Sequence, residues 1–355
     1  PKSQYRNFLM RLLPHIYKRL GVDCVVGHHV YFIADVDWGV VSKELGYPYI
    51  VLQGESLITT DDFYERVKSR MATFGKFEGT HITTYNSVVR QIYVDSGFAT
   101  PDQVTALGCM RMDGFLKRLI TNKNHVGGCR KKVTFFSIPH GTVDLADPFY
   151  PFFRDVLLTI VNFAIKNPEV DAVIKCKPGK FFGRWMKTAK RVLDDAGLRF
   201  DHISNLEICC DVDTHDLILE SDVISAFNST VMLEAGIAGK PVVIPLFDIM
   251  TTPENIESVY FRGNLHLFDV ASSMEEFETL LTKRLDDPTV DEVVMEERRT
   301  LFEKYVSSLE GGATRKYIDL TIKLTSDSEA RNVFSVEERL PALSTTPSDG
   351  KGKLD

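Results

Sequence analysis

Short apolar runs alternate with helix-like segments along most of this 355-residue chain, and this alternation constrains its fold more than any other feature. Residues 221–245 show it most clearly: a strand-like run at 223–225 leads into an almost wholly apolar helical stretch at 231–238, and a second strand-like run follows at 242–244. A helix this short and apolar has to be packed inside a domain. Strands that alternate with helices favour a parallel sheet covered by helices on both faces.

The alternation forms two series, separated by the polar and glycine-containing residues 121–131. The other predicted helices are 5–20, 36–45, 61–72, 86–96, 150–166, 184–196, 213–220, 274–285 and 291–308. The other predicted strands are 23–27, 48–52, 81–84, 103–107, 132–137, 170–175 and 205–209. We therefore predict an α/β protein with two Rossmann-like doubly wound domains, residues 1–125 and 126–324, and a ligand cleft between the carboxyl ends of their strands.

The two ends of the chain differ from this pattern. A Rossmann-like half begins with a strand, whereas this chain begins with the helix-like residues 5–20, so we expect the first domain to lack its first strand. From about residue 325 onward the sequence is rich in Ser, Thr, Pro, Asp, Gly and Lys and poor in large apolar residues. Residues 325–355 are therefore predicted to form a disordered tail.

Charge and cysteine content exclude several classes of protein. The formal net charge of -7 argues against a protein that wraps nucleic acid, which needs a large positive surface. The six cysteines form no C-x-x-C pair and no His/Cys cluster at zinc spacing, and no apolar run is long enough to span a membrane. We expect reduced thiols in a cytoplasmic protein that is soluble or peripheral at the inner face of the membrane.

The start of the helix at 231–238 has the residue types of an anion site. Asn228, Ser229 and Thr230 stand between the strand and the helix, where hydroxyls and unpaired N–H groups favour a phosphate. Glu234 is the single charge in the helix, so it lies either at the mouth of a pocket or against a partner, and its side chain points back toward Thr230. A phosphate site with a carboxylate one turn deeper, for a sugar hydroxyl, is typical of nucleotide-sugar binding. The alternative is a capped core helix whose Glu turns to solvent.

Two further strand ends carry suitable residues. The loop after strand 132–137 contains Ser137 and His140, which suit a pyrophosphate or a leaving phosphate, although a Pro-Gly turn with an incidental His is the alternative. Lys175 and Lys177 lie on the same side of an extended chain at the next strand end, so one of them can reach the cleft and neutralise a phosphate.

Residues 180–191 mix basic and aromatic side chains without an acid. This composition at the start of a helix suits an anionic membrane surface or a lipid-linked acceptor. A solvated basic face is the alternative.

The first half offers candidates for acceptor activation. Asp35 and Glu55 follow strands, where a carboxylate can deprotonate a hydroxyl, although each alone also fits a turn or a cap. His28 and His29 point to opposite faces of an extended chain, so we predict no metal site there. Arg111 is expected to contact donor phosphate or to join the two domains, and Asp113 to pair with it or to cap the helix that follows.

With these residues, the chain resembles the GT-B glycosyltransferase-like proteins of bacterial surface and capsular polysaccharide biosynthesis. That loose group includes capsule Kdo transferases, CDP-glycerol glycerophosphotransferases and bacterial sialyltransferases. The matching motifs are G-x-x-R-x-D at residues 108–113, K-x-K-P at 175–178, and S-D-x-x-x-x-x-S-T-x-x-x-E-A-x-x-x-G-K-P at 221–241. The resemblance implies a GT-B-like fold and donor roles for Ser229, Thr230 and Glu234.

One motif departs from the pattern of these families. A His-Pro pair is common near their K-x-K-P position, whereas this chain has Pro178-Gly179. The departure leaves the donor type open, and His140 would supply the imidazole from a neighbouring loop.

These residues together predict a metal-independent transferase without a cofactor. Its donor would be a nucleotide-activated sugar or glycerol, with CMP, CDP or UDP as the nucleotide, and its acceptor a polysaccharide or a lipid-linked molecule. Lys177 and His140 would stabilise the leaving phosphate. Asp35 is the first candidate for the base that deprotonates the acceptor hydroxyl, and Glu55 is the second.

Two other functions fit the same architecture. The first is a non-hydrolysing nucleotide-sugar 2-epimerase, which needs several acids and a His converging on the sugar, and no such cluster is visible in the sequence. The second is a catalytically silent scaffold of polysaccharide assembly.

Overall fold

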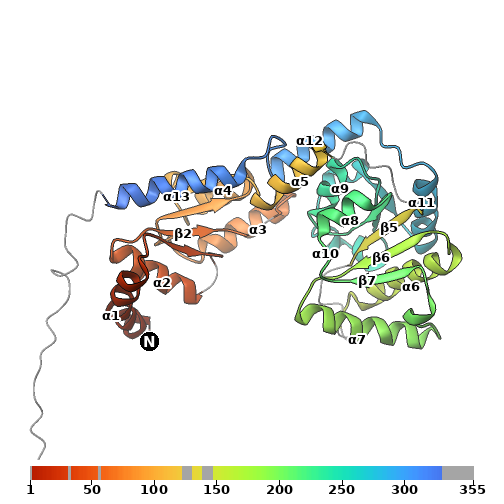
Figure 1. The fold of residues 1–355 in the computed structure, drawn as a ribbon, viewed down its shortest axis with the longest axis horizontal. Helices are drawn as coiled ribbons and strands as arrows, with labels where there is room; N and C mark the ends of the chain where they lie inside the picture. The colour runs from red at the N-terminus through yellow and green to blue at the C-terminus, as the bar shows by residue number, and fades with distance from the viewer. Residues whose placement is uncertain (1, 31–32, 55–56, 122–129, 138–146, 330–355) are drawn as a thin grey trace, which may run out of the picture. The chain divides into compact units, whose positions relative to one another are not determined.

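The computed structural model describes residues 2–30, 33–54, 57–121, 130–137 and 147–329 (Figure 1). Its helices are α1 (Lys2–Leu20), α2 (Ile33–Glu44), α3 (Asp61–Ala72), α4 (Ser87–Asp95), α5 (Met110–Thr121), α6 (Tyr150–Lys166), α7 (Lys180–Asp195), α8 (Thr214–Glu220), α9 (Val231–Ile237), α10 (Pro253–Ile256), α11 (Met274–Asp286), α12 (Glu292–Tyr305) and α13 (Ala313–Glu329). Its strands are β1 (Val25–Gly27), β2 (Tyr49–Leu52), β3 (His81–Thr84), β4 (Val104–Ala106), β5 (Lys132–Phe136), β6 (Asp171–Lys175), β7 (Leu206–Cys209), β8 (Val223–Ser225), β9 (Val242–Pro245) and β10 (Asp269–Ala271). Short 3₁₀ turns lie at η1 (Pro101–Gln103), η2 (Phe200–His202), η3 (Asp248–Thr251) and η4 (Arg262–Leu267).

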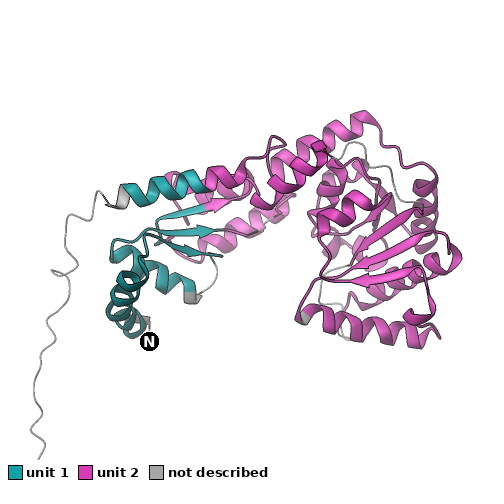
Figure 2. Ribbon diagram, in the orientation of Figure 1, with its two compact units in different colours: residues 1–52, 78–82, 318–355 teal, residues 53–77, 83–317 magenta. Residues whose placement is uncertain are grey.

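The strands form two parallel sheets, as the sequence predicts. One has four strands in the order β1-β2-β3-β4, and the other has six in the order β10-β9-β8-β5-β6-β7. The chain divides into two compact units, residues 1–52, 78–82 and 318–355, and residues 53–77 and 83–317 (Figure 2). This division differs from the predicted boundary after residue 125, which stays a prediction.

The six-stranded sheet is the centre of the larger unit. Its middle strands β5, β8 and β9 consist mainly of buried apolar residues, the pattern expected for parallel strands covered on both faces. Helices α6 and α11 pack against each other, and α9 packs against both α8 and α12.

The short helix α9 is packed inside this unit, as its apolar sequence predicts, and residues 231–236 are all buried. Arg298 of α12 packs over it and is 1% exposed. Its guanidinium donates to the carbonyl of Leu267 at 2.6 and 2.9 Å and to that of Lys240 at 3.0 Å. Burial lowers the pKa of Arg298 to about 10. Gly236 leaves room for this side chain, because an added Cβ would lie 3.1 Å from Arg298 Cδ.

The structure differs from the sequence prediction in several elements. Helix α7 begins at Lys180 rather than at 184, because Gly179, at φ 74°, turns the chain directly into the helix. The short strand β10 and the helices α10 and α13 were not predicted. Helix α5 was expected only after Asp113, whereas it begins at Met110. Residues 325–329, which the sequence assigned to the tail, belong to α13, while 330–355 lie outside the described residues.

Candidate functional site

The six-stranded sheet contains a topological switch point. The chain runs outward through β5, β6 and β7, returns to the other side of β5 as β8, and continues through β9 and β10. In open α/β sheets, ligands bind outside the carboxyl ends of the strands at such a point. Ser137 follows β5 there, and Asn228, Ser229 and Thr230 follow β8. The structure therefore places these two predicted segments next to each other at the switch point, because β5 and β8 are paired.

A charged cluster stands where α9 begins. Arg111 Nη2 donates to Glu234 Oε1 at 2.6 Å and to Thr230 Oγ1 at 2.9 Å. The other carboxylate oxygen, Glu234 Oε2, lies 3.1 Å from His215 Nε2. The Glu234 side chain is 0% exposed, whereas the Arg111 side chain is 42% exposed. Glu234 therefore has the partners that burial of a carboxylate requires, and Arg111 presents the charge of the cluster to solvent.

The charge of Glu234 is maintained by these partners. Burial, the largest influence, raises the pKa of its carboxyl group, but the hydrogen bond to His215, the charge of Arg111 and the Thr230 hydroxyl together outweigh it. The net effect lowers the pKa of Glu234, so the carboxylate stays ionised near neutral pH.

The sequence prediction missed His215 and its support. Asp213 caps α8 by accepting hydrogen bonds from the backbone N–H groups of His215 and Asp216, which fixes the start of the helix. The His215 ring stacks on Phe115 with centroids 4.3 Å apart and is buried. The rule that site residues follow strands would have included His215, because α8 follows β7 closely.

Each residue of the G-x-x-R-x-D motif contacts a segment far away in the sequence. Gly108 has φ 87°, and a Cβ there would lie 2.6 Å from Ser307 Oγ. Arg111 binds Glu234 as described. Asp113 accepts hydrogen bonds from the backbone N–H groups of Ala313 at 3.0 Å and Thr314 at 2.8 Å. Asp113 lies in the first turn of α5 and caps α13. The sequence predicts instead that it pairs with Arg111 or caps the helix after it, and this prediction is wrong.

The hydrogen bonds of Asp113 also affect its protonation. Burial raises the pKa of its carboxyl group, but the hydrogen bonds from residues 312–314 outweigh burial and lower the pKa overall.

The two lysines after β6 have different surroundings. Lys175 is buried, and its Nζ donates to the carbonyls of Cys210 at 2.6 Å and Cys176 at 3.1 Å. Lys177 is exposed. Of the two side chains, Lys177 is therefore the one that is open to solvent.

Hydrogen bonds hold the segment before α9 in place. Asn228 adopts φ 47°, donates to the Ser258 carbonyl at 3.1 Å and accepts from the Tyr260 N–H at 2.9 Å. The Ser229 hydroxyl accepts from the Val231 N–H at 3.3 Å. These contacts fix the backbone that leads from β8 into α9.

The predicted catalytic residues lie either in the smaller unit or outside the described residues. Asp35 lies half-buried in the first turn of α2, in the smaller unit. Glu55 and His140 lie outside the described residues. Their catalytic roles stay predictions.

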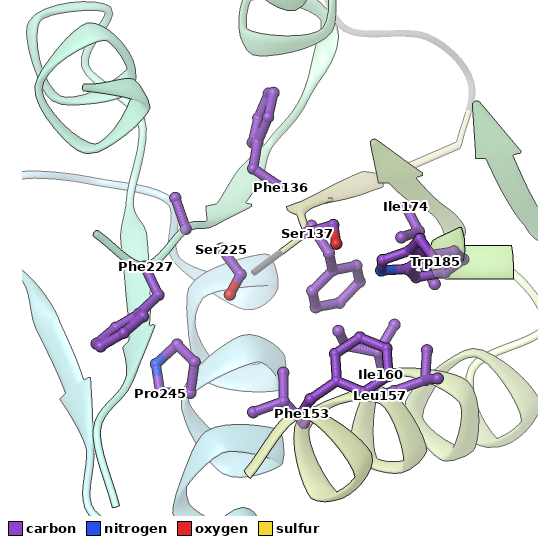
Figure 3. Close-up of a pocket in the computed structure, with 13 residues that line it drawn as sticks. Phe136, Ser137, Phe153, Leu157, Ile160, Ile174, Trp185, Ser225, Phe227 and Pro245 are labelled. Carbon is purple, nitrogen blue, oxygen red and sulfur yellow. The ribbon is translucent and has the colours of Figure 1, made fainter. Parts of the chain in front are cut away.

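A small apolar pocket lies beside the switch point (Figure 3). Aromatic and aliphatic side chains line it, together with Ser137 and Ser225 at the ends of β5 and β8 and with Trp185 of α7. Within the described part of the chain, the Trp185 Nε1–H has no hydrogen-bond partner. The cavity volume of about 20 Å³ suits a single water and is too small for a nucleotide.

A larger polar groove of about 410 Å³ lies where α3 and α4 begin and α12 ends. Its polar side chains include Asp61, Tyr64, Ser87, Gln91 and Lys304. It combines hydroxyl, amide and charged groups of both signs, which suits a polyhydroxylated molecule better than an apolar one.

Neither a metal cluster nor a membrane-spanning helix occurs among the described residues. In the described ranges, no group of three or more His, Cys, Asp or Glu is arranged to hold a metal ion. No helix among the described residues has the length and apolar character needed to cross a membrane. The five cysteines that the structure describes are free thiols.

Two parallel sheets with helices on both faces, and a switch point in the second sheet, define an α/β protein with a GT-B-like fold. No family model matches the sequence, and a search of curated proteins found no match. Solved structures do share the fold. A putative UDP-N-acetylglucosamine 2-epimerase from Listeria monocytogenes aligns with a TM-score of 0.52 and 12% identity over 94% of this chain and 82% of its own.

Two further solved structures are similar to the chain. The wall teichoic acid polymerase TagF aligns with a TM-score of 0.51 and 15% identity over 81% of this chain and 70% of its own. MnaA from S. aureus, in complex with UDP, aligns with a TM-score of 0.50 and 12% identity over 91% and 80%. At these identities the likeness shows the fold alone.

Proposed function

We propose that the chain is a GT-B-type transferase that moves a glycosyl or glycerophosphate group from a nucleotide-activated donor to a polysaccharide or lipid-linked acceptor. The observation that carries the proposal is the partly exposed Arg111 guanidinium, tied to Thr230 beside the switch point of a parallel sheet. The fold supports it, because one neighbour is named for a UDP-sugar and another was solved with UDP.

In this proposal the donor phosphates lie against Ser137, Ser229 and Thr230, with Arg111 and Lys177 supplying positive charge. Cations fixed near a leaving phosphate stabilise the charge that develops there as the bond to the transferred group breaks. CMP, CDP or UDP is the leaving nucleotide.

Glu234 acts indirectly in this proposal. One carboxylate oxygen of Glu234 is bound to Arg111 and the other to His215, and the side chain is fully buried. A direct contact with a sugar hydroxyl, as the sequence resemblance implies, requires the carboxylate to leave these partners. We therefore assign Glu234 as a positioning residue that holds Arg111 at the ligand.

The acceptor half of the proposal comprises the polar groove and the predicted bases. The polar groove at the starts of α3 and α4 has the volume and lining for part of a polyhydroxylated acceptor. Asp35, Glu55 and His140 keep their predicted roles, with the two carboxylates as alternative bases for the acceptor hydroxyl and the imidazole at the leaving phosphate.

The test is a thermal-shift panel with CMP, CDP, UDP, GDP and their sugars. Binding to the folded state adds about 2.7 kcal/mol at a hundredfold excess over Kd, so the melting temperature should rise with one nucleotide family. Lys177→Ala should weaken that nucleotide at least tenfold. Lys117→Ala, an exposed lysine on α5, is the matched control and should bind as the wild type does. A panel in which no nucleotide changes the melting temperature would refute the transferase.

An epimerase is the second candidate, because one structural neighbour is named as a UDP-N-acetylglucosamine 2-epimerase. The pair of Glu234 and His215 supplies an acid and an imidazole, but both are buried. Epimerisation at C2 exchanges the C2 hydrogen with solvent. Incubation with UDP-N-acetylglucosamine in heavy water, followed by NMR, should show no exchange if the chain is a transferase.

A silent scaffold is the third candidate. It would share the fold and could still bind nucleotide. Release of free nucleotide from the donor that gives the largest thermal shift, in the presence of acceptor extracts, distinguishes the transferase from the scaffold.

A further inference from the structure

Helix α7 carries a row of basic side chains on its outer face. Arg184, Lys187 and Arg191 are spaced i, i+3 and i+7, which places them on one face of the helix. All three are exposed, whereas Trp185, two positions before Lys187, is buried against the domain. In Figure 1, α7 runs along the outer edge of its unit. The row therefore faces outward from the core.

The charges of this row are not neutralised locally. Across the described ranges, Arg184, Lys187 and Arg191 form no salt bridge. The acids of the helix, Asp194 and Asp195, come only at its end, one turn after Arg191, so Arg184 and Lys187 have no acid near them on α7. The whole chain has a formal net charge of -7, so α7 presents a positive surface on an acidic protein.

The shape of the row favours a flat partner. The helix rises about 10 Å from Arg184 to Arg191, and the three basic side chains form a nearly straight row along this length. Exposed Gly183 adds no side chain beside them, and Phe181, 38% exposed, stands at the start of the helix. A row of cations with an aromatic ring at one end is the composition of helices that lie at the surface of an anionic bilayer.

We propose that the face of α7 formed by Arg184, Lys187 and Arg191 docks on an anionic phospholipid bilayer. Phosphate groups in the bilayer surface match the charge of the row, and Phe181 enters the headgroup region. The docking does not depend on the proposed transfer reaction, because it requires only the folded helix.

The position of α7 gives the docking a consequence, which rests on the proposed function. Lys177 lies three residues before the first residue of α7, at the carboxyl edge of the sheet. Docking through α7 therefore keeps this edge near the bilayer, where a lipid-linked acceptor would be found.

The experiment is co-sedimentation of the full chain with vesicles. Vesicles of phosphatidylcholine that contain about 30 mol% phosphatidylglycerol should bind the protein, and pure phosphatidylcholine vesicles should not. The variant R184Q/K187Q/R191Q should lower the partition coefficient by about tenfold or more. The variant R66Q/K68Q/R70Q on α3 removes the same charge from another helix and should bind like the wild type.

Two further measurements complete the test. Each single substitution, such as Arg184→Gln, should weaken binding about fivefold, which keeps the test valid if the triple variant fails to fold. Salt at about 0.5 M should release the protein, because exposed charges are then screened. The nucleotide thermal shift should be unchanged in the α7 variant, so failure of docking and failure of the transferase are separate results.

Four results would overturn the proposal. They are no binding to anionic vesicles, equal binding to neutral vesicles, equal loss in the α3 variant, and binding to a soluble polyanion such as polyphosphate without binding to vesicles.

Discussion

Glu234 and Arg111 show how one contact determines the role of a residue. A carboxylate that is 0% exposed would be strongly destabilising alone, and its pairing with Arg111 and His215 removes most of that cost. The pair is asymmetric, because the guanidinium is 42% exposed while the carboxylate is buried. Removing the cation therefore harms the fold as well as any anion site.

Arg111→Ala should destabilise the protein by leaving Glu234 without its cation. Breaking a buried pair costs about 3–5 kcal/mol, and because water can reach the site of the exposed guanidinium we expect about 2 kcal/mol. Urea unfolding measures the loss. Arg118→Ala, on the same helix and paired with the exposed Asp213 and Asp216, is the control and should cost less than about 1 kcal/mol. Equal losses in the two variants would contradict the buried-pair interpretation.

Glu234 should also contribute to the acid sensitivity of the fold. Its pKa is lowered in the folded state, so its contribution is fully present above the unfolded pKa of about 4.3 and is lost as the pH falls through the lower folded value. In Glu234→Gln the free energy of unfolding should therefore fall less between about pH 5 and pH 3 than in the wild type. Urea titrations at several pH values measure this, and parallel acid profiles of the two proteins would show that Glu234 is not responsible.

At the scale of elements, Gly108 and Asp113 join the start of α5 to the end of α12 and the start of α13. Gly108 allows the backbone to approach Ser307 with a left-handed φ, and the Cys109 N–H donates to Ser307 Oγ at 3.2 Å. Asp113 then caps α13. The G-x-x-R-x-D motif, in which Arg111 is the predicted donor contact, therefore also has a structural role.

Gly108→Ala should be destabilising, because its φ of 87° is unfavourable for Ala and the new Cβ would lie 2.6 Å from Ser307 Oγ. We expect a loss of about 2 kcal/mol in unfolding free energy. Gly114→Ala, in the helical part of α5 with nothing within 4 Å of an added Cβ, should stabilise by up to about 1 kcal/mol. The same thermal or urea measurement serves both, and a neutral Gly108→Ala would show that Ser307 and the backbone adjust at little cost.

At the scale of the whole molecule, the sequence predicts a transferase that uses side-chain cations in place of a metal. If Arg111 and Lys177 supply the positive charge at the leaving phosphate, dialysis against EDTA should leave the rate of nucleotide release within about twofold of its value in Mg²⁺. The rate is measured with the donor identified by thermal shift. Loss of activity that Mg²⁺ restores would contradict the prediction.

Most of the fold follows from local patterns in the sequence. The predicted strands at 48–52, 81–84 and 170–175 match β2, β3 and β6 closely, because apolar runs bounded by turn residues are local signals. Helix α13 was missed, since its start depends on a cap from Asp113, about 200 residues earlier. Strand β10 has only three residues and carries no periodic signal of its own.

The candidate site divides in the same way. The sequence alone determined that an acidic, two-sheet α/β chain carries Ser229, Thr230 and Glu234 at a strand-to-helix junction, because periodicity, turn residues and side-chain chemistry are local. Only the tertiary structure decided that Glu234 is buried between Arg111 and His215, and that β5 and β8 are neighbours at a switch point. The physical reason is that burial and charge pairing depend on which distant segments the fold brings together, and no local pattern records that.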